Sequence, residues 1–167
     1  DWWNNDYFDD TYFHNGQRKP FTGYTTDVFF EHAIQWMRTE AAAERPFFCY
    51  LATAAAHGPL LVPPKYRELY PDQKEPVARF FGMITNIDEN VGRLEACLRE
   101  TGQRDNTVLI FMTDNGGTVG VPIFNAGMRG RKVELYEGGH RVPCFIRWTG
   151  GGLRGPGDRA ELTEVQD

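Results

Sequence analysis

Cysteine is scarce in this sequence of 167 residues, which contains three: Cys49, Cys97 and Cys144. Three widely separated cysteines do not suggest a disulfide framework, and none belongs to a CxxC or CxxH pair of the kind that binds zinc. Each has apolar neighbours, which is typical of a buried structural thiol. The sequence therefore predicts neither a disulfide nor a zinc site.

Long apolar runs and a positive net charge are also missing. No stretch approaches the ~18 consecutive apolar residues of a membrane-spanning helix, so we expect no membrane span. The formal net charge of −5 argues against a general nucleic-acid-binding role. Residues 121–159 depart from this balance with seven basic and three acidic residues. Such a segment suits an anionic substrate, or it forms a solvated loop.

What the sequence does contain is enough apolar material for one domain. Hydrophobic residues make up 41% of the chain and charged residues 25%, which are ordinary values for a globular domain with a core. Two segments have the apolar spacing of amphipathic helices. They are residues 27–43, where Phe30, Ile34 and Met37 recur, and residues 76–100.

Three apolar stretches predict strands: residues 46–56, 108–112 and 142–148. The first two have the continuous apolar character of buried strands. Residues 1–24 and 118–140 are rich in turn-forming residues, and we expect them to be irregular. The order of helices and strands predicts an α/β fold with a mixed, mostly parallel sheet covered by helices.

The stretch 108–117, VLIFMTDNGG, combines a predicted strand with a polar turn. It places the carboxylate of Asp114 and the amide of Asn115 side by side before two glycines. Hard oxygen donors at the carboxyl end of a strand suit a cation such as calcium or magnesium. The same residue types also favour a plain turn. Taken alone, the stretch leaves both interpretations open.

Two further polar residues follow predicted strands. His57 comes after the first strand, in AAAHGPL, and Lys132 lies in the long loop, in RGRKVELYEGGHRVP. In α/β proteins, active sites form at the carboxyl ends of strands. An isolated histidine or a loop lysine is otherwise expected to be structural or solvated.

These motifs together resemble the formylglycine-dependent sulfatase family. The similar segments are TDNGG, NAGMRGRK, LYEGGHRVP and WTGGG, with PFFCYLATAAAHGPL and the predicted helix ARFFGMITNIDENVGRLEACL upstream. The resemblance covers nearly the whole chain, and its most specific part is residues 113–143. It implies an alkaline-phosphatase-like α/β fold and hydrolysis of sulfate esters in a sulfated small molecule or glycan. It also implies an exported parent protein.

The resemblance implies a role for each polar residue. Asp114 and Asn115 would be metal ligands of a divalent cation, usually calcium and sometimes magnesium. Lys132 would be a catalytic residue that binds a sulfate oxygen and offsets developing charge. His57 would bind the ester oxygen and protonate the leaving group.

Parts of the family pattern are missing. No C/S-x-P/A-x-R motif is present to supply the formylglycine nucleophile, and Asp9 and Asp10 do not follow an apolar strand as the family's paired aspartates do. We therefore expect residues 1–167 to be the second half of a sulfatase catalytic domain. The isolated chain should be inactive and bind cations weakly, because it needs the remainder of the parent chain.

Two alternatives stay open at this point. One is a phosphodiesterase or phosphatase of the same superfamily, although the YEGGHRVP segment favours a sulfatase. The other is a non-catalytic binding module that retains the fold. The four retained residues His57, Asp114, Asn115 and Lys132 speak against the module.

Overall fold

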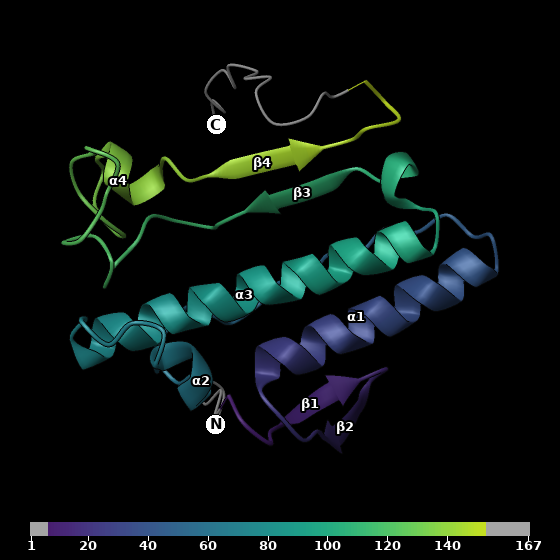
Figure 1. Ribbon diagram of the computed structural model, residues 1–167, viewed down its shortest axis with the longest axis horizontal. Helices are drawn as coiled ribbons and strands as arrows, with labels where there is room; N and C mark the ends of the chain where they lie inside the picture. Colours follow the sequence, from purple (N-terminus) through teal and green to yellow (C-terminus); the bar gives the residue numbers. More distant parts are fainter. Residues whose placement is uncertain (1–6, 153–167) are drawn as a thin grey trace.

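A computed structural model describes residues 7–152 of the chain (Figure 1). Its elements are β1 (Thr11–His14), β2 (Gln17–Pro20), α1 (Thr25–Ala42), α2 (Pro64–Arg67), α3 (Glu75–Glu100), a 3-10 turn (Arg104–Asn106), β3 (Leu109–Met112), α4 (Glu137–His140) and β4 (Cys144–Arg147). The two long helices expected from apolar spacing are confirmed as α1 and α3. None of the described helices is both long enough and apolar enough to cross a bilayer.

The interface between α1 and α3 forms the main core. Its buried residues are Phe30, Ile34 and Met37 of α1 and Leu94, Cys97 and Leu98 of α3. They recur at intervals of three and four residues, which places them on one face of each helix. Of the three cysteines, Cys97 is fully buried as expected, whereas Cys49 and Cys144 are half-buried, and all three are free thiols.

The N-terminal segment is more regular than the sequence suggested. Its first six residues lie outside the described part of the chain, but β1 and β2 form an antiparallel hairpin against α1 (Figure 1). Asn15 and Gly16, with φ of 52° and 78°, make the two-residue turn. Positive φ at both turn positions matches the twist of a hairpin. The expectation of irregular structure over residues 1–24 was therefore wrong for residues 11–20.

The segment 46–56 was expected to be a buried strand, and that prediction was wrong. It forms no ladder of backbone hydrogen bonds with any other described segment. Phe47, Cys49 and Leu51 pack against the helical core, while Phe48 and Tyr50 are 87% and 83% exposed. The period-2 alternation of a strand is thus present. What is lacking is a neighbouring strand with which its backbone can pair.

The described strands also pair differently from the expected sheet. β3 pairs with β4 in antiparallel register, with Ile110 opposite Ile146. No parallel pair occurs within residues 7–152, and β3 is partly exposed rather than buried. The connection from β3 to β4 contains only the single-turn helix α4 and no long crossover helix, which suits antiparallel pairing. The α/β class is as predicted, but the mostly parallel arrangement is not seen in these two strand pairs.

The layers are arranged in a simple order. α1 and α3 lie side by side, with the β1–β2 hairpin on the outer side of α1 and the β3–β4 pair along α3 (Figure 1). A second apolar cluster, of Tyr7, Tyr24 and Met83, packs against residues 54–56 and 60–62. It supports the segment that carries His57.

Candidate functional site

The turn after β3 presents two oxygen-bearing side chains. Asp114 is exposed and Asn115 is half-buried. Neither side chain makes a hydrogen bond or ion pair with another residue in the described part of the chain. Carboxylate and amide oxygens that lack protein partners are available to an external ligand.

Close backbone packing fixes the position of this turn. The amide of Gly116 donates to the carbonyl oxygen of Gly139 at 2.9 Å. A Cβ atom on Gly116 would lie 1.8 Å from the carbonyl oxygen of Gly138, and one on Gly139 would lie 2.0 Å from that of Glu134. Side chains cannot be accommodated at such distances. Gly116 is therefore required for the two segments to touch, and Gly139 is required for the close packing of its own loop.

A second backbone hydrogen bond brings Lys132 to the turn. Its backbone amide donates to the carbonyl oxygen of Gly117 at 3.1 Å, and the residue is half-buried. The two neighbouring cations have protein partners: Arg129 lies 3.6 Å from the centre of the Tyr136 ring, and Arg131 forms an ion pair with Glu134 at 3.4 Å. The Lys132 ammonium has no such partner within residues 7–152, so it is free to bind an anion.

The loop between Gly117 and β4 is held by its own hydrogen bonds. The side-chain amide of Asn125 donates to the carbonyl oxygens of Met128 and Gly130, both at 2.8 Å. The YEGG motif begins the single-turn helix α4, where Glu137 pairs with Arg141. Local contacts thus order this part of the basic segment, and none of the contacts described here involves the Lys132 ammonium.

His57 lies on a separate, well-anchored segment. The buried hydroxyl of Tyr7 donates to the carbonyl oxygens of Ala54 and His57, at 2.9 and 2.8 Å. The His57 ring is exposed, and its Nδ1 lies 2.9 Å from the Gly58 carbonyl oxygen. Because a carbonyl only accepts, Nδ1 carries the hydrogen in this contact. Nε2 is then the nitrogen left to exchange a proton with a ligand.

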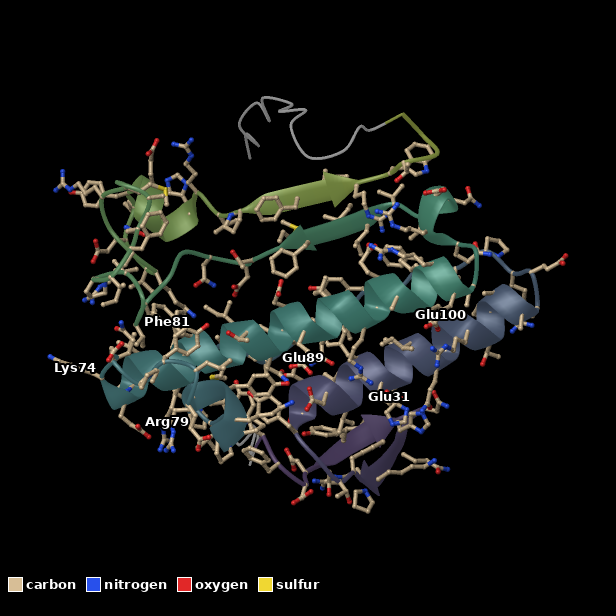
Figure 2. The ribbon with its side chains drawn as sticks, viewed as in Figure 1. Glu31, Lys74, Arg79, Phe81, Glu89 and Glu100 are labelled. Atoms are coloured by element: carbon tan, nitrogen blue, oxygen red, sulfur yellow. The ribbon has the colours of Figure 1, made fainter. Side chains whose placement is uncertain are left out.

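Both polar segments pack on the same end of α3. Met83 belongs to the cluster that supports residues 54–56. One turn away, Phe80 and Phe81 lie against Gly120 of the long loop. Figure 2 shows Phe81 near the N-terminal end of α3, beside that loop. The structure joins Lys132 directly to the Asp114 turn, whereas the segment carrying His57 and the long loop both pack on α3.

Sequence reasoning missed the residues that hold these segments in place. Asp27 of α1 accepts hydrogen bonds from the amides of Asn86 and Asn90, both at 2.7 Å. The two asparagines are buried in α3 and are four residues apart. Two polar residues four positions apart on the apolar face of a helix are the sequence feature that could have identified them. Tyr7, in contrast, gave no local signal, because its partners lie about 50 positions along the chain.

The chemistry of the turn fits a hard cation, although the number of donors is small. Calcium takes six to eight oxygen ligands and magnesium about six. Asp114 and Asn115 are two residues, and their side-chain oxygens can fill only some of these ligand positions. No group of three or more His, Cys, Asp or Glu side chains suited to a metal occurs within the described residues. The turn therefore supplies part of a coordination shell.

Comparison with known proteins identifies the family of this chain. The Sulfatase family model matches residues 1–167. The chain is 30% identical over 158 residues to a protein named "Uncharacterized sulfatase YdeN" of Escherichia coli K12, covering 93% of this chain and 28% of that protein. It is also 30% identical over 129 residues to N-acetylgalactosamine-6-sulfatase of Canis lupus familiaris, covering 75% of this chain and 24% of that protein.

A solved structure shows the same fold. The crystal structure of Ps i-CgsB in complex with k-i-k-neocarrahexaose matches with a TM-score of 0.76 and 33% identity, over 81% of this chain and 30% of that one. The neighbouring sulfatase structures have the alkaline-phosphatase-like fold, so this part of the prediction is confirmed. The chain spans less than a third of the length of these relatives. It belongs to the sulfatase family.

Proposed function

We propose that the protein containing these residues hydrolyses sulfate esters, and that residues 113–139 form the part of its active site that binds the sulfate group. One observation carries the proposal. A turn with two free oxygen-bearing side chains is hydrogen-bonded to the loop that presents the unpaired Lys132 ammonium. Family membership supports the same reaction. An anion fits there because it can contact both a bound cation and the ammonium.

The proposed roles follow from the chemistry of each side chain. Asp114 and Asn115 would hold a divalent cation, calcium or magnesium, which when bound supplies positive charge to the sulfate oxygens. The Lys132 ammonium contacts a sulfate oxygen and stabilises the charge that develops as the ester bond breaks. His57, with its hydrogen on Nδ1, holds a proton on Nε2 when charged and donates it to the departing alcohol oxygen.

The nucleophile would come from outside the 167 residues. The chain contains no serine, and its three cysteines do not stand in the motif of the formylglycine precursor. We infer that these residues are the second half of the catalytic domain and that the chain alone does not turn over sulfate esters. The hydrate of a formylglycine in the remainder of the protein would attack sulfur and release the alcohol, and the sulfated residue would then eliminate sulfate and regenerate the aldehyde, which splits one difficult step into two.

The most suitable substrate class is a sulfated glycan. The matched crystal structure holds a neocarrahexaose, and the mammalian relative is named for an N-acetylgalactosamine sulfate. A sulfated glycan is polyanionic, which suits the basic residues of the segment 121–152. Such substrates occur outside the cytoplasm, and we propose that the protein is exported.

The test is a pair of variants in the full-length protein, assayed on an aryl sulfate and on the matching phosphate ester. Lys132→Ala should lower kcat/KM for the sulfate by about 10²–10³-fold, the loss typical of one charge-stabilising group. Arg131→Ala is the matched control, because Arg131 is a neighbouring cation already paired with Glu134. Faster hydrolysis of the phosphate, or equal losses in both variants, would contradict the proposal.

His57→Ala adds a distinct signature. A general acid matters most when the leaving group is a poor one. The variant should therefore lose far more activity on an alkyl sulfate than on a nitrophenyl sulfate. A uniform loss on both esters would mean that His57 only shapes the loop.

A further inference from the structure

An open groove of about 340 Å³ lies where the loop after β2 meets α1 and α3. It is lined by the rings of Phe21, Tyr24 and His32 and by the charged side chains of Asp27, Glu31 and Arg93. Its lining residues belong to the segment 21–32 and to α3, so the groove is separate from residues 113–139. The volume is at the small end of the range for ligand pockets, about 300–1,000 Å³. It therefore suits a ligand of about one sugar ring.

The loop that forms one wall of the groove is held in place before any ligand binds. The Gly23 amide donates to the Asp9 carboxylate at 2.7 Å, and the Asp9 amide donates to the Gly23 carbonyl oxygen at 3.0 Å. Gly23 has a φ of 111°, which glycine adopts without strain. The Phe21 ring lies against the rings of Tyr12 and His32, at centroid distances of 5.6 and 5.1 Å. This preorganisation lowers the cost of binding.

The helices supply polar groups to the same groove. Asp27 uses Oδ1 to accept from the amides of Asn86 and Asn90, and its Oδ2 has no hydrogen-bond partner within residues 7–152. Glu31, which Figure 2 labels on α1 beside the hairpin, is ion-paired with Arg93 of α3. Carboxylates accept hydrogen bonds and a guanidinium donates them. The groove thus offers both acceptors and donors, and its two carboxylates outnumber its one guanidinium.

Aromatic rings combined with these polar groups suit an uncharged sugar. A sugar ring has an apolar C–H face that packs on an aromatic ring, and each of its hydroxyl groups both donates and accepts. The excess of carboxylates disfavours a sulfate group inside the groove. A cation does lie nearby: the His14 ring is 5.6 Å from that of His32, and the Lys19 ammonium is 3.5 Å from His14 Nδ1.

We propose that this groove binds an uncharged sugar unit of a glycan, at a site distinct from the proposed sulfate site. The Lys19 ammonium beside it contacts a sulfate on an adjoining unit. The choice of a glycan rests on the proposed function, whereas the preference for an uncharged ring rests on the groove itself. Binding one chain at two places raises the effective concentration of its sulfate esters at the active site.

The first test is affinity electrophoresis of the full-length protein in gels that contain an uncharged galactan or dextran. At least one of the two polysaccharides should retard the wild-type protein. Thr22→Trp places a large side chain at the groove, because Thr22 lines it, and should weaken the retardation at least about tenfold. Thr11→Trp is the matched control on an exposed position of β1. No retardation of the wild type, or equal retardation of both variants, would overturn the proposal.

The second test separates glycan binding from turnover. Glu31→Ala should raise KM for a long sulfated glycan about tenfold, because a hydrogen bond to a charged group is lost, and should leave kcat/KM for an aryl sulfate unchanged. Glu40→Ala, which removes a carboxylate paired with Arg45 further along α1, is the control. Equal KM values for the two variants on the glycan would count against the site. Retardation without any sulfate hydrolysis would overturn the proposed function and leave the groove's role standing.

Discussion

The backbone amide of Gly116 lies 2.9 Å from the carbonyl oxygen of Gly139, and this contact joins the turn carrying Asp114 to the loop carrying Lys132. The two segments are separated by more than twenty residues of irregular chain. Backbone packing between these glycines therefore fixes their relative position, in addition to the pairing of β3 with β4. Any side chain at this contact should disturb both halves of the proposed site at once.

Gly116→Ala tests that dependence. The new methyl group would lie 1.8 Å from the Gly138 carbonyl oxygen, so the two segments must separate. We expect a loss of at least about 1–3 kcal/mol in the free energy of unfolding, measured by urea denaturation, together with loss of activity in the full-length protein. Gly92→Ala is the control, since nothing lies within 4 Å of its Cβ position in α3. There the alanine should stabilise the helix by about 0.5–1 kcal/mol.

Removal and addition of calcium or magnesium test the proposed ligands. A cation at 100 times its Kd stabilises the folded state by about 2.7 kcal/mol, so it should raise the thermal midpoint of the full-length protein. Asp114→Ala and Asn115→Ala should abolish most of that rise. Asp72→Ala, which removes an exposed carboxylate elsewhere, should preserve it.

The isolated 167-residue chain should behave differently in the same titration. It offers two ligand residues at the turn, and the rest of the shell would come from outside. Calorimetry should therefore detect weak binding or none. Submicromolar calcium binding by this chain would show that the described residues already complete a site.

The half-buried carboxylate of Asp27 gives a prediction about stability. It is the common acceptor for the amides of Asn86 and Asn90, at 2.7 Å each. Asp27→Ala leaves two buried donors without that partner, and should lower the free energy of unfolding by about 2–4 kcal/mol. Glu100→Ala removes an exposed ion pair with Arg38 and should have a much smaller effect. Similar urea midpoints for both variants would contradict this assignment.

Local sequence patterns predicted the two long helices well, but not the single-turn helices α2 and α4. The apolar spacing of Phe30, Ile34 and Met37 located α1 to within two residues at each end, because a helix is specified by contacts along its own face. The pairing of residues 46–56 could not be predicted in this way. The pattern of Phe47 to Leu51 is that of a strand, but a strand also requires a partner.

The sequence predicted which residues belong to the candidate site, but not how those residues are placed relative to one another. The sequence pattern singled out Asp114 and Asn115, and the resemblance added Lys132. Their adjacency emerges from the backbone hydrogen bonds of Gly116 with Gly139 and of Lys132 with Gly117. The loop between them contains no periodic pattern from which its path could be derived. The anchoring of His57 by Tyr7 is a long-range contact of the same kind.

Tyr7 provides a prediction for alkaline pH. Burial raises the pKa of its hydroxyl from 10.0 to about 12. Between these values the unfolded chain has lost the proton while the folded protein keeps it. The folded state then binds more protons, so stability falls as pH rises from about 10 to about 12. Burial also raises the pKa of Tyr24, which adds to the fall.

Tyr7→Phe should therefore make the decline between pH 10 and pH 12 shallower, although Tyr24 keeps it from vanishing. At pH 8 the variant should be less stable by about 1–2 kcal/mol, because the carbonyl oxygens of Ala54 and His57 lose their shared donor. Urea midpoints at pH 8, 10 and 11 measure both effects. Tyr136→Phe, on the exposed loop, should follow the wild-type profile. An unchanged alkaline slope in Tyr7→Phe would mean that this hydroxyl is not the group that destabilises the fold, and that His57 is held by other contacts.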